Sequence, residues 1–120
     1  MPRILTVDDS AAMRQMVRVT LTSAGYDVEQ AKDGREALDI ANASTFDLVI
    51  TDVNMPEMDG LTLVRHLRGM PSYRHTPLLV LTTEGSAERK MQGREAGATG
   101  WLVKPFNPDR LLATVAKVLK

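Results

Sequence analysis

The chain has 120 residues, 43% of them hydrophobic and 25% charged, and it contains no cysteine. This length suits one domain with a single core, while the lack of cysteine excludes disulfide bonds and thiolate zinc sites. The formal net charge is zero, which argues against general binding to nucleic acids or membranes, and the short apolar start fits neither a signal peptide nor a membrane span, so we expect a cytoplasmic protein.

The first part of the chain predicts a strand, a helix and an edge strand. Residues 3–7 form a short apolar run that is typical of a buried strand, and two adjacent acids close it. Apolar positions in residues 13–24 recur every three or four residues, which predicts a helix that Gly25 ends. Residues 26–31 alternate weakly and carry two acids, as a strand near a sheet edge would.

The next segment predicts a second helix and the central strand. Asp33 and Glu36 have the spacing of a capping box, so we expect a helix to begin there and to end before residues 42–45. Residues 48–50 are apolar and rich in β-branched side chains, which indicates a strand buried on both faces. This strand ends in a charge at Asp52, where a carboxylate can serve as a site.

A third helix and a fourth strand follow. The apolar face within residues 61–67 predicts a helix that stops at Gly69, and residues 70–77 have the composition of a loop. Residues 78–81 form another apolar run, which ends at Thr82. We therefore expect the fourth strand of the chain here.

The fourth predicted helix has weak signals. Ser86 provides a cap, but Gly93 lies in the interior, where glycine costs about 1 kcal/mol relative to alanine. Its expected apolar contacts are Ala87, Met91 and Ala96. We expect this helix to be the element that responds most easily to a change elsewhere.

The last predicted elements are a short strand and a well-marked helix. Residues 101–103 form the fifth apolar run, which Lys104 follows directly. Asn107 is a suitable cap and Pro108 a suitable first residue for a helix whose buried face lies within residues 111–119.

Five strand-like runs thus alternate with five helical ones, which predicts a doubly wound α/β domain. Right-handed crossovers place helices on both faces of a parallel sheet and bring all strand-to-helix loops to one edge. Five polar side chains meet at that edge: Asp8, Asp9, Asp52, Thr82 and Lys104.

The residue types at this edge indicate phosphoryl chemistry. Two carboxylates at ~4 Å repel by roughly 4 kcal/mol at an effective dielectric constant near 20, so a cluster of them needs a cation. Oxygen ligands without cysteine or a well-placed histidine suit Mg²⁺ better than zinc, and we expect His66 and His75 to be ordinary surface residues. A carboxylate beside Mg²⁺, a lysine and a hydroxyl group can accept a phosphoryl group.

These residues closely resemble the signature of response-regulator receiver domains. The matching motifs, spread over the whole chain, are Asp8-Asp9, Asp52 followed by Met55-Pro56 and Asp59-Gly60, Thr82-Thr83-Glu84, and Lys104-Pro105-Phe106. The resemblance implies a single receiver domain over residues 1–120 without an output domain, most similar to the stand-alone chemotaxis regulators. It also implies a flavodoxin-like five-stranded parallel sheet of strand order 2-1-3-4-5 with five helices.

The resemblance assigns roles to the residues of the acidic edge. Asp52 would be the phosphoacceptor of a histidine kinase, and the protein would catalyse only its own phosphorylation and dephosphorylation. Asp9 and Asp52 would bind Mg²⁺ by their side chains, Asn54 by its backbone carbonyl and Asp8 through water. Lys104 would contact the phosphoryl oxygens.

The resemblance also implies a switch. Thr82 would hydrogen-bond the phosphoryl group, and the aromatic residue of the fifth strand would then change rotamer; here that residue is Trp101, where the family more often has tyrosine or phenylalanine. The peptide bond between Lys104 and Pro105 is expected to be cis.

The expected partners are a histidine kinase and an effector protein, such as a flagellar motor switch, bound by a monomer. Residues 1–60 hold 5 basic and 11 acidic residues, whereas residues 61–120 hold 10 and 4. Part of the basic half is on the fourth helix, at Arg89, Lys90 and Arg94. The fourth helix, fifth strand and fifth helix therefore form the expected partner-binding face, without nucleic acid or membrane.

Three alternatives stay open at this stage. Within the family, the chain could be a phosphorelay intermediate that passes its phosphoryl group to another histidine. A haloacid-dehalogenase-type phosphatase also uses a strand-end aspartate, but it needs an acid two residues later, where this chain has Asn54. A flavodoxin-type electron carrier would need a first loop rich in glycine and hydroxyl residues, and adjacent aspartates would repel the flavin phosphate.

Overall fold

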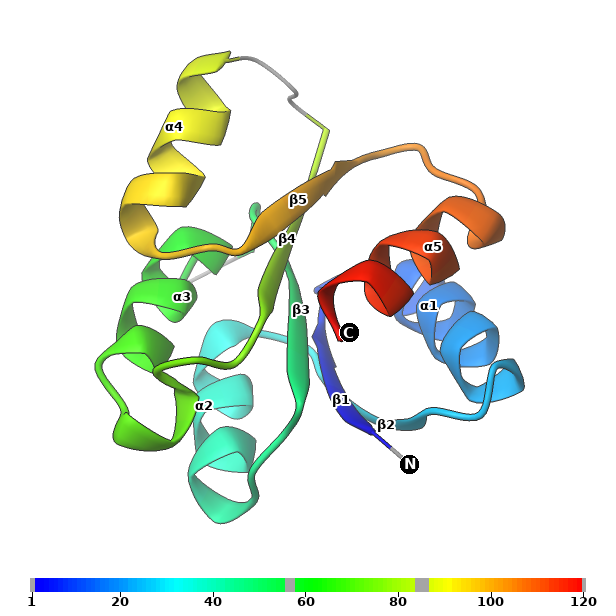
Figure 1. The fold of residues 1–120 in the computed structure, drawn as a ribbon, viewed down its shortest axis with the longest axis horizontal. Coiled ribbons are helices and arrows are strands. Elements are labelled where there is room, and N and C mark those ends of the chain that lie inside the picture. Colours follow the sequence, from blue (N-terminus) through cyan, green and yellow to red (C-terminus); the bar gives the residue numbers. More distant parts are fainter. Residues whose placement is uncertain (1, 56–57, 84–86, 120) are drawn as a thin grey trace.

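Short apolar strands pair side by side into a parallel sheet of order β2-β1-β3-β4-β5 (Figure 1). The computed structural model describes residues 2–55, 58–83 and 87–119. The elements in these ranges are β1 (Arg3–Val7), α1 (Ala11–Ser23), β2 (Asp27–Ala31), α2 (Gly34–Ala43), β3 (Leu48–Asp52), α3 (Gly60–Arg68), the 3₁₀ turn η1 (Pro71–Tyr73), β4 (Leu78–Thr82), α4 (Ala87–Ala96), β5 (Gly100–Val103) and α5 (Pro108–Val118). The predicted fold class and strand order are confirmed.

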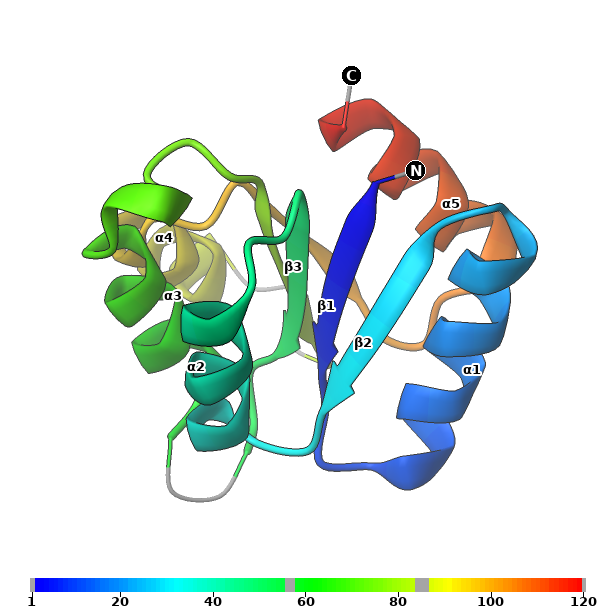
Figure 2. The same ribbon diagram turned by 90° about the horizontal axis from the view of Figure 1, so that it is seen from below.

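The sheet separates two apolar layers because successive strand residues point to opposite faces. Figures 1 and 2 show α1 and α5 on one face of the sheet and α2, α3 and α4 on the other. In β3, Leu48 and Ile50 pack with α1 and α5, whereas Val49 packs with α2 and α3. The central strand is therefore buried on both faces, and its end, Asp52, is fixed between two packed layers.

Helices α2 and α5 begin at the caps that the sequence predicted. Asp33 accepts a hydrogen bond from the backbone N–H of Glu36 at 2.8 Å, and Asn107 caps α5 in the same way. The second half of the capping box differs, because Glu36 accepts from the N–H of Lys32 at 3.1 Å and not from that of Asp33. Ser86, the predicted cap of α4, lies outside the described residues.

The prediction that Met91 makes an apolar contact of α4 is wrong. Met91 is 61% exposed, whereas Ala96 is buried. Gly93 is also buried, and residues 93 and 96 share one helical face, while residue 91 is rotated about 200° from residue 93 at 100° per residue. The buried face of α4 is thus made of small residues, which leaves this helix with little apolar anchoring.

The predicted loop at residues 70–77 contains the turn η1, which carries a buried tyrosine. The Tyr73 hydroxyl lies 3.0 Å from the carbonyl oxygen of Ala41 and 2.7 Å from that of Ser44, to which it donates. This side chain ties the segment before β4 to the end of α2.

Arg68, in the last turn of α3, joins three segments at the amino-terminal edge of the sheet. Its guanidinium group donates to five acceptors, namely the carbonyl oxygens of Gly97 (2.8 Å), Tyr73 (2.7 Å), Arg74 (3.3 Å) and Thr76 (2.7 Å) and the hydroxyl of Thr99 (3.2 Å). Arg68 therefore fixes the carboxyl end of α4 against α3 and η1.

Helix lengths are modest throughout. Over residues 2–55, 58–83 and 87–119, none of the helices is both long enough and apolar enough to span a lipid bilayer.

Candidate functional site

The carboxyl ends of β1, β3, β4 and β5 bring together the polar residues that the sequence singled out. Asp8 directly follows β1, Asp52 and Thr82 are the last residues of β3 and β4, and Lys104 directly follows β5. Because β3 lies between β1 and β4 in the sheet, Asp52 occupies the middle of this edge. Asp8, Asp52 and Thr82 are all buried.

Lys104 lies between the carboxylates of Asp8 and Asp52. Its Nζ atom donates to Asp52 Oδ1 at 3.1 Å and to Asp8 Oδ2 at 3.2 Å. The side chain of Asp52 is 9% exposed, that of Asp8 is 5% exposed and that of Lys104 is 14% exposed. Little water reaches these charges, so each depends on its partners for stabilisation.

The surroundings shift the pKa values of Asp52 and Lys104. Burial, followed by the nearby charge of Asp8, raises the pKa of Asp52 above 3.8, although Lys104 opposes this shift. For Lys104, burial acts to lower the pKa, but the hydrogen bond to Asp52 and the charges of Asp8 and Asp52 outweigh it and raise the pKa. These contacts favour the charged form of Lys104, while burial and the charge of Asp8 disfavour the charged form of Asp52.

The loop after β1 is held by contacts to Asp8. One carboxylate oxygen of Asp8 accepts the N–H of Ser10 at 2.9 Å, and the Asp8 carbonyl oxygen accepts from Arg14 Nη1 at 2.7 Å. Arg14 is in turn linked through its own carbonyl oxygen to Gln30 on β2, at 3.0 Å. Arg14 could not be predicted from the sequence, because a contact between a helix side chain and a loop carbonyl oxygen leaves no sequence pattern.

The first residue of α3, Gly60, packs against the backbone of Asp52 and Val53. The N–H of Gly60 donates to the carbonyl oxygen of Val53 at 2.9 Å. A Cβ atom at Gly60 would lie 2.1 Å from the carbonyl oxygen of Asp52, which no side chain allows. Asp59 caps the helix by accepting from the N–H of Thr62 at 2.8 Å. Glycine at position 60 is thus required for the close approach of the helix to the central strand.

Asp8, Asp9 and Asp52 form a group that fits a metal ion. Each offers a carboxylate oxygen, and these three atoms lie within 4.8 Å of one another. The group holds three carboxylates, and Lys104 contacts two of them, Asp8 and Asp52, so the group keeps an excess of negative charge. Its donors are all oxygen, and Asp9 is exposed, which leaves room for water in the coordination shell of a hard ion such as Mg²⁺.

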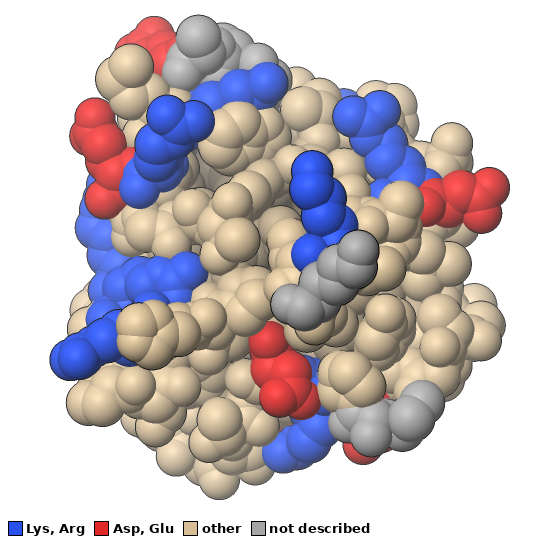
Figure 3. Space-filling model, in the orientation of Figure 1, with Lys and Arg blue, Asp and Glu red and all other residues tan. Residues whose placement is uncertain are grey.

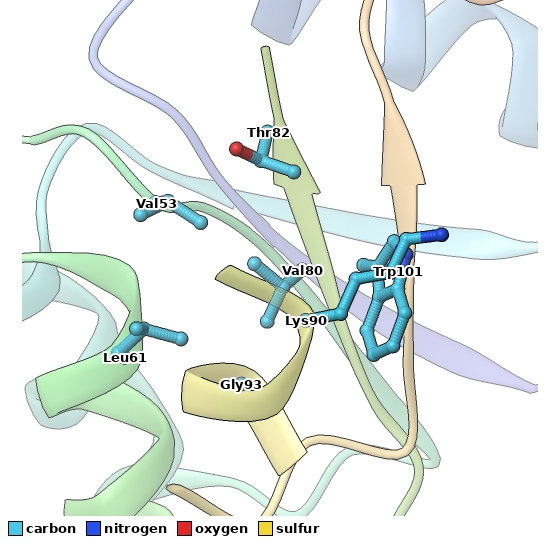
Figure 4. Close-up of a pocket in the computed structure, with 7 residues that line it drawn as sticks. All are labelled: Val53, Leu61, Val80, Thr82, Lys90, Gly93 and Trp101. Atoms are coloured by element: carbon cyan, nitrogen blue, oxygen red, sulfur yellow. The ribbon is translucent and has the colours of Figure 1, made fainter. Parts of the chain in front are cut away.

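The remaining predicted residues lie around this group. Asn54 is exposed, two residues beyond Asp52. Trp101 pairs with Val80 in the β4–β5 ladder and is partly buried beside a cavity that Thr82 also lines (Figure 4). The peptide between Lys104 and Pro105 is cis, as predicted. His66 and His75 are exposed on α3 and the following loop, so they are surface residues as predicted.

Comparison with known proteins agrees with this geometry. A family model described as "Response regulator receiver domain" matches residues 4–116. A structure of the chemotaxis response regulator CheY4 of Vibrio cholerae has a TM-score of 0.96 and 55% sequence identity, over 98% of both chains. A structure of a response regulator of Chloroflexus aurantiacus has a TM-score of 0.94 and 38% identity, over 98% of this chain and 97% of the other.

Curated relatives include longer proteins. The response regulator MprA of Mycolicibacterium vanbaalenii is 44% identical over 98% of this chain and 50% of its own length. The DNA-binding transcriptional regulator RpaA of Synechocystis is 39% identical over 100% of this chain and 50% of its own length. The chain thus spans about half the length of these relatives.

Proposed function

Because the chain belongs to the response-regulator receiver family, we propose that Asp52 accepts a phosphoryl group from a histidine kinase and thereby changes the affinity of this domain for a partner protein. The observation that carries the proposal is the group of Asp8, Asp9 and Asp52, in which Lys104 contacts Asp52 at 3.1 Å and Asp8 at 3.2 Å. Receiver domains act in two-component signalling, where one partner is a kinase and another is an effector.

The reaction needs a carboxylate nucleophile that approaches phosphorus. An oxygen of Asp52 forms the new P–O bond, the P–N bond of the donor phosphohistidine breaks, and the electron pair of that bond leaves with the imidazole. Asp52 is suited to this role because it is held at the end of the central strand and packed from behind by Gly60. Phosphorylation changes its charge from −1 to about −2 at neutral pH.

Lys104 supplies the fixed positive charge for the transferred group. Its Nζ atom donates to Asp52 and Asp8 in the unphosphorylated protein. In the proposed reaction it contacts the phosphoryl oxygens, where negative charge increases. Asp9 and Asp52, with the Asn54 carbonyl oxygen and with Asp8 through water, would hold Mg²⁺. When bound, Mg²⁺ supplies charge neutralisation between the carboxylates and the incoming phosphoryl group.

We place the partner-binding face on α4, β5 and α5. Figure 3 shows lysine and arginine side chains, with acidic ones beside them, over the region of α4 and α3. The basic residues of α4 include Lys90 and Arg94, and its acidic residues are Glu88 and Glu95. The lysine and arginine side chains of this face suit an acidic partner segment. The support for a role in chemotaxis is the identity of 55% with CheY4 over nearly the full length of both chains. The transcriptional relatives have lower identity, at 39% to 44%.

Replacement of Asp52 by asparagine tests the proposal. With Mg²⁺ and a phosphohistidine donor or a small acyl phosphate, the wild type should take up one phosphoryl group that is labile to hydroxylamine, and Asp52→Asn should take up none. Asp39→Asn is a matched control, because Asp39 is an exposed aspartate on α2. Labelling that persists in Asp52→Asn would overturn the assignment.

Two of the alternatives can be distinguished with the same protein. A phosphorelay intermediate would return its phosphoryl group to a second histidine-containing protein, whereas a chemotaxis regulator would bind its effector while phosphorylated. A phosphatase of the haloacid-dehalogenase type would turn over phosphate esters continuously. The exposed Asn54 in place of the acid that such a phosphatase requires argues against continuous turnover.

A further inference from the structure

Every polar atom of Asp8 has a hydrogen-bond partner. Its N–H donates to the carbonyl oxygen of Ala31 on β2 at 3.2 Å. Its Oδ1 atom accepts from the N–H of Ser10 at 2.9 Å, and its Oδ2 atom accepts from Lys104 at 3.2 Å. The remaining atom is the carbonyl oxygen, to which Arg14 of α1 donates at 2.7 Å. Two of these bonds hold the carboxylate, and the other two hold the backbone.

The carbonyl oxygen bound by Arg14 belongs to the peptide unit that joins Asp8 to Asp9. A peptide unit is planar, so a bond that fixes its oxygen fixes the orientation of the whole unit. The direction in which the Asp9 side chain leaves the backbone depends on this orientation. Asp9 is the exposed member of the three carboxylates that fit a metal ion. Arg14 therefore acts on a metal ligand through the backbone.

Arg14 is well placed for this contact because its own backbone is held at both ends. Its N–H donates to the carbonyl oxygen of Ser10 at 3.0 Å, and its carbonyl oxygen accepts from Gln30 Nε2 on β2 at 3.0 Å. Helix α1 lies beside β1 and β2 (Figure 2). The bond from its guanidinium group to the Asp8 carbonyl oxygen is charge-assisted, and such bonds are stronger than those between neutral groups.

The charge of Arg14 and its hydrogen bond have opposite effects on a metal ion. A cation near the acidic group repels Mg²⁺, so by charge alone the loss of the guanidinium group should tighten metal binding. The loss of a bond that orients a metal ligand should weaken metal binding, since such partners typically change affinity by about 10- to 100-fold. The sign of the change therefore distinguishes the two effects.

We propose that Arg14 is a positioning residue for the metal site, because its bond to the Asp8 carbonyl oxygen holds the Asp8–Asp9 peptide in the orientation in which Asp9 can bind Mg²⁺. This inference rests on the proposed function, in which Mg²⁺ serves the phosphorylation of Asp52. Arg14 acts through Asp9 and takes no part in phosphoryl transfer itself. Its loss should raise the Mg²⁺ concentration that phosphorylation requires, and should lower the rate at saturating Mg²⁺ much less.

Two variants of Arg14 and one control separate charge from position. Arg14→Met removes the donor, and its dissociation constant for Mg²⁺ should rise by about tenfold. Arg14→Lys retains the charge but replaces the planar guanidinium fork by a shorter side chain with a single ammonium group, so its dissociation constant should rise by about threefold or more. Arg18→Met is the matched control, because Arg18 is an exposed arginine one turn further along α1. It loses the same charge and should bind Mg²⁺ like the wild type or slightly more tightly.

The experiment titrates each isotope-labelled protein with Mg²⁺ alone and follows the backbone amides by NMR. The amide of Asp9 is the direct reporter, because its N–H shares a peptide unit with the Asp8 carbonyl oxygen. In metal-free Arg14→Met we expect its signal to shift and broaden, since the released peptide exchanges between orientations. The same proteins are then phosphorylated with a small acyl phosphate at increasing Mg²⁺ concentrations, which separates the half-saturating concentration from the maximal rate.

A raised dissociation constant in both Arg14 variants, with Arg18→Met near the wild type, supports the inference. Wild-type or tighter Mg²⁺ binding in Arg14→Met would overturn it, as would an equal loss of affinity in Arg18→Met or a maximal rate lowered as strongly as the affinity. If the amide signals show that Arg14→Met does not fold, Arg14→Lys decides in its place. If the wild type binds Mg²⁺ but takes up no phosphoryl group, the proposed function fails, while the Mg²⁺ titrations still decide the role of Arg14.

Discussion

Replacing Asp52 by asparagine should make the metal-free protein more stable. At an effective dielectric constant near 20, the 3.1 Å contact with Lys104 contributes roughly 5 kcal/mol of attraction, and Asp8 and Asp9, with oxygens within 4.8 Å, each contribute roughly 3.5 kcal/mol of repulsion. Asparagine removes all three interactions, and Lys104 keeps Asp8 as a partner at 3.2 Å.

The two repulsions together exceed the attraction by about 2 kcal/mol, which favours the variant. Because Asp9 is exposed, water weakens its repulsion with Asp52 and reduces this difference. Burial of the charged carboxylate adds a further cost that asparagine avoids. We therefore expect a gain of about 1–2 kcal/mol, which at about 4 °C per kcal/mol raises Tm by about 4–8 °C for a domain of this size.

The assay is thermal unfolding in the presence of a chelator, with Asp39→Asn as the control. At neutral pH, Mg²⁺ should stabilise the wild type more than Asp52→Asn, because the variant has lost a ligand.

The difference should also depend on pH. Because the pKa of Asp52 is raised above 3.8 in the folded state, the folded wild type binds its proton more tightly than the unfolded chain does. Its stability therefore falls as the pH rises from 3.8 through that raised pKa. The gap between variant and wild type should be largest at neutral pH and should close on acidification. The explanation by carboxylate repulsion would be refuted if Asp52→Asn melted at a lower temperature than the wild type at neutral pH without metal. It would also be refuted if the stability difference between the two proteins increased in acid.

Three further changes test other parts of the structure. Lys104→Met should lower the stability of the metal-free protein by about 3–5 kcal/mol, because it leaves buried carboxylates without a cation; denaturant titration should show that Mg²⁺ restores part of the loss. Gly60→Ala should cost about 3 kcal/mol in the same titration and impair phosphorylation, since its Cβ atom would lie 2.1 Å from the Asp52 carbonyl oxygen. Tyr73→Phe should cost about 1–2 kcal/mol by removing a buried hydroxyl donor, while phosphorylation stays at the wild-type rate.

The sheet and most helix ends could be predicted because their signals are local. A run such as residues 48–50 is too short for a helix and too apolar for a loop, and Asn107 and Pro108 mark a helix start within two residues. The acidic edge could be predicted as well, because parallel strands with right-handed crossovers bring Asp8 and Asp52 to one side whatever the details of packing.

Contacts between distant segments could not be predicted in the same way. Tyr73 and Arg68 reach backbone carbonyl oxygens, which every residue possesses, so no residue pattern identifies their partners. Met91 was assigned to the buried face of α4 because it is apolar, but the helix packs through Gly93 and Ala96. At this interface the close packing of the helix requires small side chains, so the more hydrophobic Met91 lies on the exposed face.

Because of the contacts of Arg68, we expect the amino-terminal and carboxyl-terminal ends of the strands to open locally at different rates. Because one guanidinium group binds the segments at residues 73–76 and 97–99, neither segment can separate from α3 without breaking shared hydrogen bonds. Segments linked in this way open as one cooperative unit, so their backbone amides should exchange with deuterium slowly and at a common rate. At the acidic edge the shared donor is Lys104, whose acceptors change charge on phosphorylation. Amide exchange there should respond to Mg²⁺ and to phosphorylation, while the Arg68 edge keeps its protection.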